Sequence, residues 1–131
     1  MKKKILYIED NEQNLYLVTY ILQKSGYEVV GARDGQEGIA AASRMRPALI
    51  LLDIQLPVMD GYTVARKLRE AGQVAGVPIV ALTSYAMAGD REKALEAGCT
   101  GYIEKPINPE TFLAQMEQHL NERPSPGGTA T

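Results

Sequence analysis

The sequence predicts an α/β fold in which five parallel strands form a doubly wound sheet covered by helices. Two observations indicate this fold. Five short apolar runs alternate regularly with stretches of helical character. Several runs are apolar almost throughout, as in residues 49–52 and 79–82, which is typical of strands buried on both faces. Because crossovers between parallel strands are right-handed, the alternation corresponds to five βα units wound into one sheet.

The predicted strands are short, and the stretches that separate them are long enough for one helix each. The strands cover Lys4–Ile8, Tyr27–Gly31, Ala48–Leu52, Val77–Leu82 and Gly101–Glu104. Glycine or proline follows four of the helices, at Ser25-Gly26, Arg46-Pro47, Ala71-Gly72 and Ala97-Gly98. Pro109 is expected to open the last helix, because its fixed φ suits a first helical turn.

The chain has room for one domain of ordinary size. At 131 residues it can bury one substantial core, which we expect within residues 1–122. Residues 123–131 contain two prolines, two glycines and few side chains whose burial could offset the cost of ordering them. We therefore expect a disordered tail after the domain.

Composition argues against several classes of function. The formal net charge is -2 and the basic residues are scattered apart from Lys2–Lys4, so direct nucleic-acid binding is not expected. No apolar run approaches the roughly 18 residues needed to span a bilayer. Cys99 is the single cysteine, which excludes an internal disulfide and suits a packed residue in a reducing compartment. A cytoplasmic protein without membrane contact is the expectation.

Carboxylates follow two of the predicted strands. Glu9 and Asp10 come directly after the first strand, and Asp53 follows the third. Because parallel strands place their carboxyl ends at one edge of a sheet, these three acids should meet there. They would repel one another unless a cation lay among them. Oxygen ligands are those that magnesium prefers, so the sequence predicts a Mg²⁺ site around Asp53.

The next two strand ends carry a hydroxyl and an ammonium group. Thr83 follows the fourth strand and Lys105 follows the fifth. Such groups beside Mg²⁺ could hold phosphoryl oxygens and spread the charge that develops during transfer. The constellation therefore indicates phosphoryl transfer centred on Asp53.

These motifs resemble the receiver domain of response regulators, the CheY-like family of two-component signalling. The similarity runs from Lys4 to about Glu122 and rests on ILYIEDN, LILLDIQLPVMDG, IVALTS and GYIEKP. The wording of EDNEQN, LPVMDGY and GYIEKPI is most similar to single-domain regulators of the DivK type and to hybrid-kinase receivers. The resemblance implies a flavodoxin-like sheet with strand order 2-1-3-4-5 and a cis peptide bond before Pro106.

The resemblance also implies a role for each acid. Asp53 would accept a phosphoryl group from a phosphohistidine on a sensor histidine kinase or histidine phosphotransfer protein. Asp10 and Asp53 would bind Mg²⁺ directly, Glu9 would act through water, and the main-chain carbonyl of Gln55 would supply a further ligand. The first acid is Glu9 where many relatives carry aspartate, which lengthens its arm.

By the same resemblance, the other strand ends form a switch. Lys105 would pair with the phosphoryl group, Thr83 would move toward it, and Tyr102 would turn inward. A downstream protein would read the altered surface. The chain would then be a phosphoacceptor signalling domain that phosphorylates and dephosphorylates only itself, and not an enzyme acting on other substrates.

Two rival functions remain at this point. A haloacid-dehalogenase-type phosphatase also forms an aspartyl phosphate, but such enzymes typically carry a second aspartate two residues beyond the nucleophile, and residue 55 is glutamine. A flavodoxin-like nucleotide or flavin binder would need a phosphate loop rich in small residues after the first strand, where EDNEQN stands.

Several residues also have a purely structural interpretation. Asp10-Asn11 can cap the first helix, and Asp60 is expected to cap another helix. Tyr102 taken alone is better explained as a half-buried core aromatic. His119, the only histidine, is expected to be a solvated helix residue with no phosphohistidine or zinc role.

The first helix is apolar around more of its girth than a core-facing helix needs. Leu17, Val18, Ile21 and Leu22 form one stripe, with Leu15, Tyr16 and Tyr20 partly off it. We expect some of this surplus to be exposed and to help dock a helical phosphodonor. A wider buried face or a homodimer contact is the competing interpretation.

Overall fold

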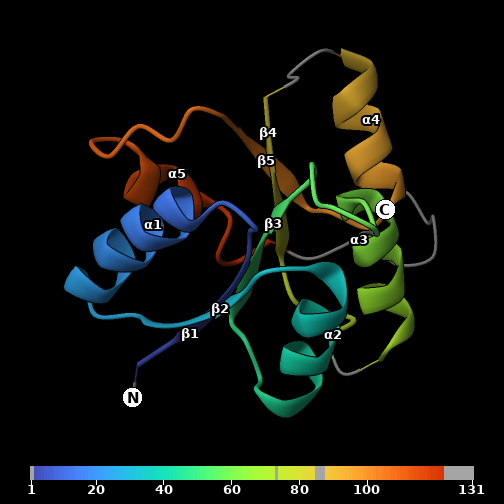
Figure 1. The fold of residues 1–131 in the computed structure, drawn as a ribbon, viewed down its shortest axis with the longest axis horizontal. Helices are drawn as coiled ribbons and strands as arrows, with labels where there is room; N and C mark the ends of the chain where they lie inside the picture. The colour runs from blue at the N-terminus through green and yellow to red at the C-terminus, as the bar shows by residue number, and fades with distance from the viewer. Residues whose placement is uncertain (1, 73, 85–87, 123–131) are drawn as a thin grey trace.

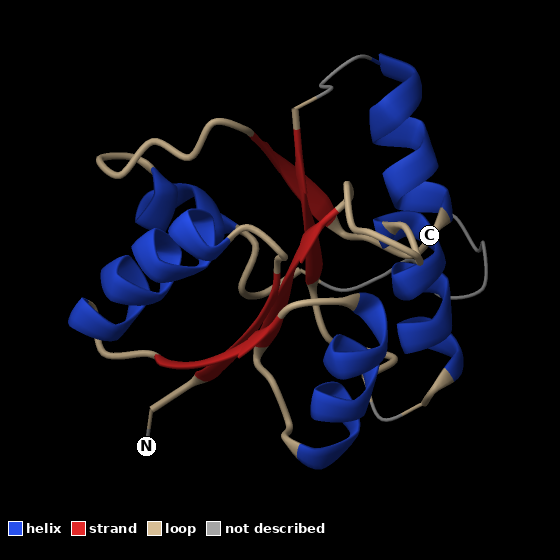
Figure 2. Cartoon of the chain, viewed as in Figure 1, coloured by secondary structure: helices blue, strands red, loops and turns tan. Residues whose placement is uncertain are grey.

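The computed structural model describes residues 2–72, 74–84 and 88–122. The predicted tail, residues 123–131, lies outside the described residues. Five parallel strands form one sheet in the order β2-β1-β3-β4-β5, which confirms the predicted topology (Figure 2). The strands are β1 Lys4–Ile8, β2 Glu28–Ala32, β3 Leu49–Asp53, β4 Ile79–Thr83 and β5 Gly101–Glu104.

Helices cover both faces of this sheet. They are α1 Glu12–Lys24, α2 Gly35–Arg44, α3 Gly61–Glu70, α4 Ala88–Glu96 and α5 Phe112–Gln118. Helices α1 and α5 lie on one side, and α2, α3 and α4 lie on the other (Figure 1). Alternate strand residues therefore enter two separate cores, so that Ile5 and Tyr7 pack on the side of α1 and α5 while Leu6 and Ile8 pack on the opposite side. Every residue of β3 and β4 is buried, as the continuous apolar runs predict.

Strands β2 and β3 each begin one residue later than predicted, and two other predicted element starts are wrong by two or three residues. Strand β4 begins at Ile79 and not at Val77, because the Val77 N–H bonds back to Val74 in a turn and Pro78 has no N–H to donate. Helix α5 begins at Phe112 and not at Pro109. The carbonyl of Asn108 accepts from the N–H groups of residues 111 and 112, so Pro109 belongs to the turn that precedes the helix.

The helix ends follow the predicted signals. Gly26, Gly72 and Gly98 adopt positive φ after α1, α3 and α4. Asn11 caps α1 by accepting the N–H of Asn14, and Asp60 caps α3 by accepting the N–H of Thr63, as expected for both.

The predicted packing of Cys99 is confirmed, since its side chain is buried and its burial raises the thiol pKa to about 12. None of the helices within the described residues is both long and apolar enough to cross a membrane.

Candidate functional site

Strand pairing brings the predicted acids together. Tyr7 pairs with Leu51 and Ile8 with Leu52 across β1 and β3, so the following residues, Glu9 and Asp53, emerge level with each other. Carboxylate oxygens of Glu9, Asp10 and Asp53 lie within 4.8 Å of one another. Glu9 and Asp53 are buried, whereas Asp10 is exposed at the mouth of the cluster.

Lys105 supplies the positive charge beside these acids. Its Nζ lies 3.1 Å from Asp53 Oδ1 and 3.7 Å from Glu9 Oε1. The backbone N–H of Lys105 donates to the Thr83 carbonyl, which ties the end of β5 to the end of β4. The Lys105-Pro106 peptide bond is cis, as the resemblance implied. One ammonium offsets only part of the charge of three carboxylates.

The donor set fits a magnesium ion. Mg²⁺ binds oxygen ligands at about 2.1 Å, so ligands on opposite sides of its octahedron lie about 4 Å apart. The carboxylate oxygens lie within 4.8 Å of one another, which is compatible with that span, and exposed Asp10 leaves the cluster open to water molecules as further ligands. A bound Mg²⁺ would supply charge neutralisation for phosphoryl oxygens beside Asp53.

Backbone contacts hold Asp53 in place. The Gln55 N–H donates to Asp53 Oδ1 at 2.9 Å. Farther along the same loop, Val58 has φ of 66° and is fully exposed, and the Met59 N–H bonds to the Pro57 carbonyl in a tight turn. The structure thus places the Gln55 backbone against Asp53, while metal binding by the Gln55 carbonyl stays a prediction.

Tyr7 is a site residue that the sequence reasoning missed. Its hydroxyl donates to Glu9 Oε1 at 2.8 Å, and burial, followed by the charge of Glu9, raises the pKa of this phenol, so that it stays a donor. The available signal was a tyrosine in an otherwise aliphatic strand, two residues before Glu9 and therefore on the same face.

Burial dominates the electrostatics of Glu9. Desolvation raises the pKa of Glu9 to about 7, and the neighbouring Asp53 adds to this rise. Hydrogen bonding from Tyr7 and the charge of Lys105 act in the opposite direction. Below about pH 7 the metal-free protein therefore favours the protonated form of Glu9, and a bound cation would displace this proton.

We expect the metal-free protein to lose stability as pH rises through the window from about 4.5 to 7. In this window folded Glu9 holds a proton that the unfolded chain has released, so the unfolding free energy falls with pH, by as much as about 3 kcal/mol. Adding Mg²⁺ should restore stability above pH 7, because the cation favours the ionised carboxylates. Urea unfolding at several pH values, with EDTA or with Mg²⁺, measures both effects.

The matched pair of variants for this titration is Glu9→Gln and Glu12→Gln. Glu9→Gln should flatten the slope between pH 5 and 7. Glu12 is exposed and paired with Arg33, which lowers the pKa of Glu12, so its variant should keep the wild-type slope. An unchanged slope in Glu9→Gln would contradict the assignment.

Thr83 and Tyr102 lie on the neighbouring strands β4 and β5. Thr83 is the last residue of β4 and is buried. Tyr102 is half-buried against the core on the side of α2, α3 and α4, and the Arg91 guanidinium lies 5.7 Å from its ring centroid. The structural interpretation of Tyr102 as a half-buried aromatic is therefore confirmed, and its inward turn stays a prediction.

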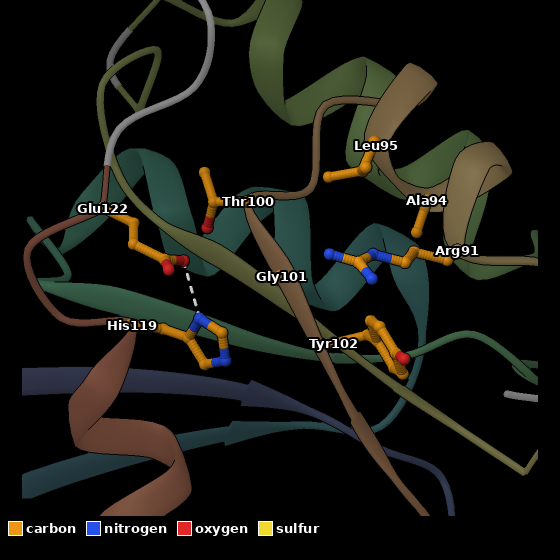
Figure 3. Close-up of a pocket in the computed structure, with 8 residues that line it drawn as sticks. All are labelled: Arg91, Ala94, Leu95, Thr100, Gly101, Tyr102, His119 and Glu122. Carbon is orange, nitrogen blue, oxygen red and sulfur yellow. Dashed lines mark hydrogen bonds and ion pairs between the residues drawn. The ribbon is translucent and has the colours of Figure 1, made fainter. Parts of the chain in front are cut away.

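The prediction of a solvated His119 is wrong. A cavity of about 140 Å³ lies between α4, β5 and the end of α5, and His119 and Tyr102 are among the residues that line it (Figure 3). His119 is half-buried, and its Nδ1 lies 2.6 Å from Glu122 Oε1. The ring packs over Gly101 so closely that a Cβ there would lie 2.4 Å from His119 Cε1.

Two of the apolar side chains on α1 that lie off its core-facing stripe are exposed, as expected. Tyr16 and Tyr20 are 76% and 54% exposed, which rules out a wider buried face as the explanation for these two rings. The Lys24 ammonium lies 5.6 Å from the centroid of the Tyr20 ring.

Comparisons with known proteins agree with this geometry and give no support to the phosphatase alternative. The chain is 38% identical over 122 residues to the polar-differentiation response regulator DivK of Brucella anthropi, covering 93% of this chain and 99% of that protein.

Two solved receiver domains share the fold. The receiver of sensor histidine kinase PA1611 from Pseudomonas aeruginosa, solved with magnesium in its active-site cleft, is 35% identical with a TM-score of 0.83, covering 93% of this chain and 100% of that one. The Saccharomyces cerevisiae Ssk1 receiver, solved with the phosphotransfer protein Ypd1, is 30% identical with a TM-score of 0.83, covering 90% and 88%.

The model of one protein family, described as the response regulator receiver domain, matches residues 5–117. This match covers most of the chain and includes every residue of the acidic cluster and Lys105. The chain therefore belongs to the response regulator receiver domain family of two-component signalling.

Proposed function

We propose that Asp53 accepts a phosphoryl group from a phosphohistidine and thereby switches a protein-binding surface. The observation that carries this proposal is the position of the Asp53 carboxylate, 3.1 Å from the Lys105 ammonium and within the cluster of three acids. The P–N bond of the donor imidazole breaks and a P–O bond to Asp53 forms. No second protein nucleophile is required.

The neighbouring groups have distinct parts in this transfer. Asp10, Asp53 and the Gln55 carbonyl would hold Mg²⁺ directly, with Glu9 acting through water. Lys105 would pair with a phosphoryl oxygen, a role supported by the contact of its ammonium with Asp53. The hydroxyl of Thr83 would approach another phosphoryl oxygen.

The proposed change in the protein-binding surface follows from the charge that phosphorylation adds. Phosphorylation replaces the single negative charge of the Asp53 carboxylate with a phosphoryl group of about one and a half to two negative charges, at the edge of the sheet where the ends of β4 and β5 lie side by side. A shift of Thr83 toward the phosphoryl group would let Tyr102 turn inward and alter the surface formed by α4 and β5. A downstream protein would read this surface in the cytoplasm, and the chain would catalyse no reaction on other substrates.

Incubation of the protein with Mg²⁺ and acetyl phosphate tests the acceptor. We expect one phosphoryl group per chain, stable in acid and labile in alkali, which peptide mass spectrometry after borohydride reduction places at Asp53. EDTA should prevent the incorporation. Steady release of phosphate from many substrates, or a label at another residue, would overturn the proposal.

We further infer that a helical phosphodonor docks on α1. Helix α1 begins at Glu12, directly after the acidic cluster, and exposes Tyr16 and Tyr20 along one line. Similarity to the Ssk1 receiver, which was crystallised with a phosphotransfer protein, supports a donor of that class.

The double variant Tyr16→Ser, Tyr20→Ser should slow transfer from a phosphorylated histidine phosphotransfer protein by roughly tenfold or more, because large exposed aromatics are frequent binding hot spots. Phosphorylation by acetyl phosphate should be unchanged. Leu95→Ser removes an exposed apolar side chain from α4 and is the control, with both rates expected at wild-type values. Equal transfer rates for all three proteins would contradict docking, and loss of a dimer in sedimentation would favour the homodimer contact.

A further inference from the structure

Tyr7 brings a buried hydroxyl to the acidic site from the interior of the sheet. The side chain is fully buried and lies on β1, an interior strand between β2 and β3. Its ring packs in the core on the side of α1 and α5, among residues that include Leu51 and Val18. The hydroxyl reaches the carboxyl end of the strand and donates to Glu9 Oε1 at 2.8 Å.

Both oxygens of Glu9 are held by donors of its own segment. Oε1 accepts from Tyr7, and Oε2 accepts from the backbone N–H of Asn11 at 3.3 Å. Lys105 Nζ is farther from Glu9, at 3.7 Å, than from Asp53, at 3.1 Å. Of these three donors, Tyr7 makes the shortest contact to Glu9, and the Lys105 ammonium lies closer to the proposed phosphoryl acceptor.

The Glu9 side chain that Tyr7 contacts is longer than an aspartate side chain would be. A glutamate has one more rotatable bond than an aspartate, so fixing its carboxylate costs more conformational entropy. An aromatic ring locked in a packed core is a rigid support for a hydrogen-bond donor. A phenylalanine at this position would keep the ring and leave buried Glu9 Oε1 without its closest donor.

We propose that Tyr7 is a positioning residue for the metal site, whose hydroxyl fixes the Glu9 carboxylate so that the acidic cluster is organised before Mg²⁺ arrives. This inference rests on the proposed function of the cluster and adds a residue to it. Glu9 would act on the metal through water, so it belongs to the outer partners of the site, whose removal typically lowers metal affinity by 10- to 100-fold. Removing the donor that orients Glu9 should cost an amount near the lower end of this range.

Tyr7→Phe should therefore weaken Mg²⁺ binding by roughly tenfold. Titration calorimetry is the suitable measurement, because the chain contains no tryptophan to report binding by fluorescence. Tyr27→Phe is the matched control. The Tyr27 hydroxyl also donates to a carboxylate, Glu117 Oε2 at 2.6 Å, but this pair joins the start of β2 to α5 on the exposed surface and should leave Mg²⁺ affinity unchanged.

A second background separates positioning from a general loosening of the core. Glu9→Asp keeps a carboxylate in the cluster but shortens its arm by one methylene, so the Tyr7 hydroxyl no longer reaches it. Adding Tyr7→Phe to Glu9→Asp should leave the Mg²⁺ affinity of the single variant unchanged. An equal loss of affinity in both backgrounds would show that the hydroxyl acts on the fold and not on Glu9, and would overturn the proposal.

The outcomes also separate this inference from the proposed function. Absence of Mg²⁺ binding in the wild-type protein would refute the metal site itself. Wild-type binding together with unchanged or tighter binding in Tyr7→Phe would refute only the role of Tyr7. Thermal unfolding in EDTA checks that Tyr7→Phe is folded. The supporting result is a folded Tyr7→Phe variant that binds Mg²⁺ more weakly than the wild type, together with no further loss of affinity when Tyr7→Phe is added to Glu9→Asp.

Discussion

Asp53→Asn should abolish Mg²⁺-dependent phosphorylation by acetyl phosphate. The amide is a poor nucleophile, so it cannot form the P–O bond on which the proposed transfer depends. It also removes one of the three carboxylates that lie within 4.8 Å of one another, and with it part of the attraction for the cation. We therefore expect no detectable phosphoryl group by mass spectrometry and a smaller stabilisation by Mg²⁺ in thermal unfolding.

Asp60→Asn is the control for this experiment. Asp60 lies in the same sequence motif and carries the same charge, but its side chain accepts the Thr63 N–H as the cap of α3. Asparagine caps helices about as well as aspartate, so this variant should fold and phosphorylate normally. Phosphorylation that persists in Asp53→Asn, or that fails equally in Asp60→Asn, would refute Asp53 as the acceptor.

The prediction of the fold succeeded because the same pattern, a short apolar run followed by a helical stretch, occurs several times in the sequence. Continuous apolar runs such as residues 49–52 and 79–82 have few interpretations other than buried parallel strands. The acidic cluster could be predicted for a related reason, since Glu9, Asp10 and Asp53 each come at the carboxyl end of such a run. Topology then brings together residues that are distant in the chain.

Features that depend on contacts with one particular neighbouring residue could not be predicted from the sequence. His119 is surrounded in sequence by polar residues, and only the structure shows that Gly101 leaves room for its ring over β5. The sequence places Tyr7 on the same face of its strand as Glu9, but only the structure shows that its hydroxyl lies 2.8 Å from the Glu9 carboxylate. The start of α5 depends on backbone bonds to Asn108, which outweigh the preference of Pro109 for a first helical turn.

Gly61→Ala should destabilise the protein and impair the site at the same time. A Cβ at Gly61 would lie 2.5 Å from Ile54 Cα and 2.7 Å from the Asp53 carbonyl oxygen, and both are backbone atoms that cannot rotate away. The Gly61 N–H also bonds to the Ile54 carbonyl, so α3 starts directly against the loop that follows Asp53. Relief of this overlap requires a shift of the backbone, at a cost of about 1–3 kcal/mol or more.

Gly89→Ala provides the matched comparison, because it makes the same chemical change in the first turn of α4. There, apart from its chain neighbours and the backbone of its own helix, no atom of the described residues lies within 4 Å of the added Cβ. Alanine favours the helix there, so this variant should be unchanged or more stable by about 0.5 kcal/mol. Urea unfolding should thus show opposite or clearly unequal effects, and the initial rate of phosphorylation by acetyl phosphate should fall only in Gly61→Ala. Equal stability and equal rates in the two variants would mean that the loop after Asp53 yields without disturbing the carboxylate, and that close packing of α3 against it does not position the acceptor.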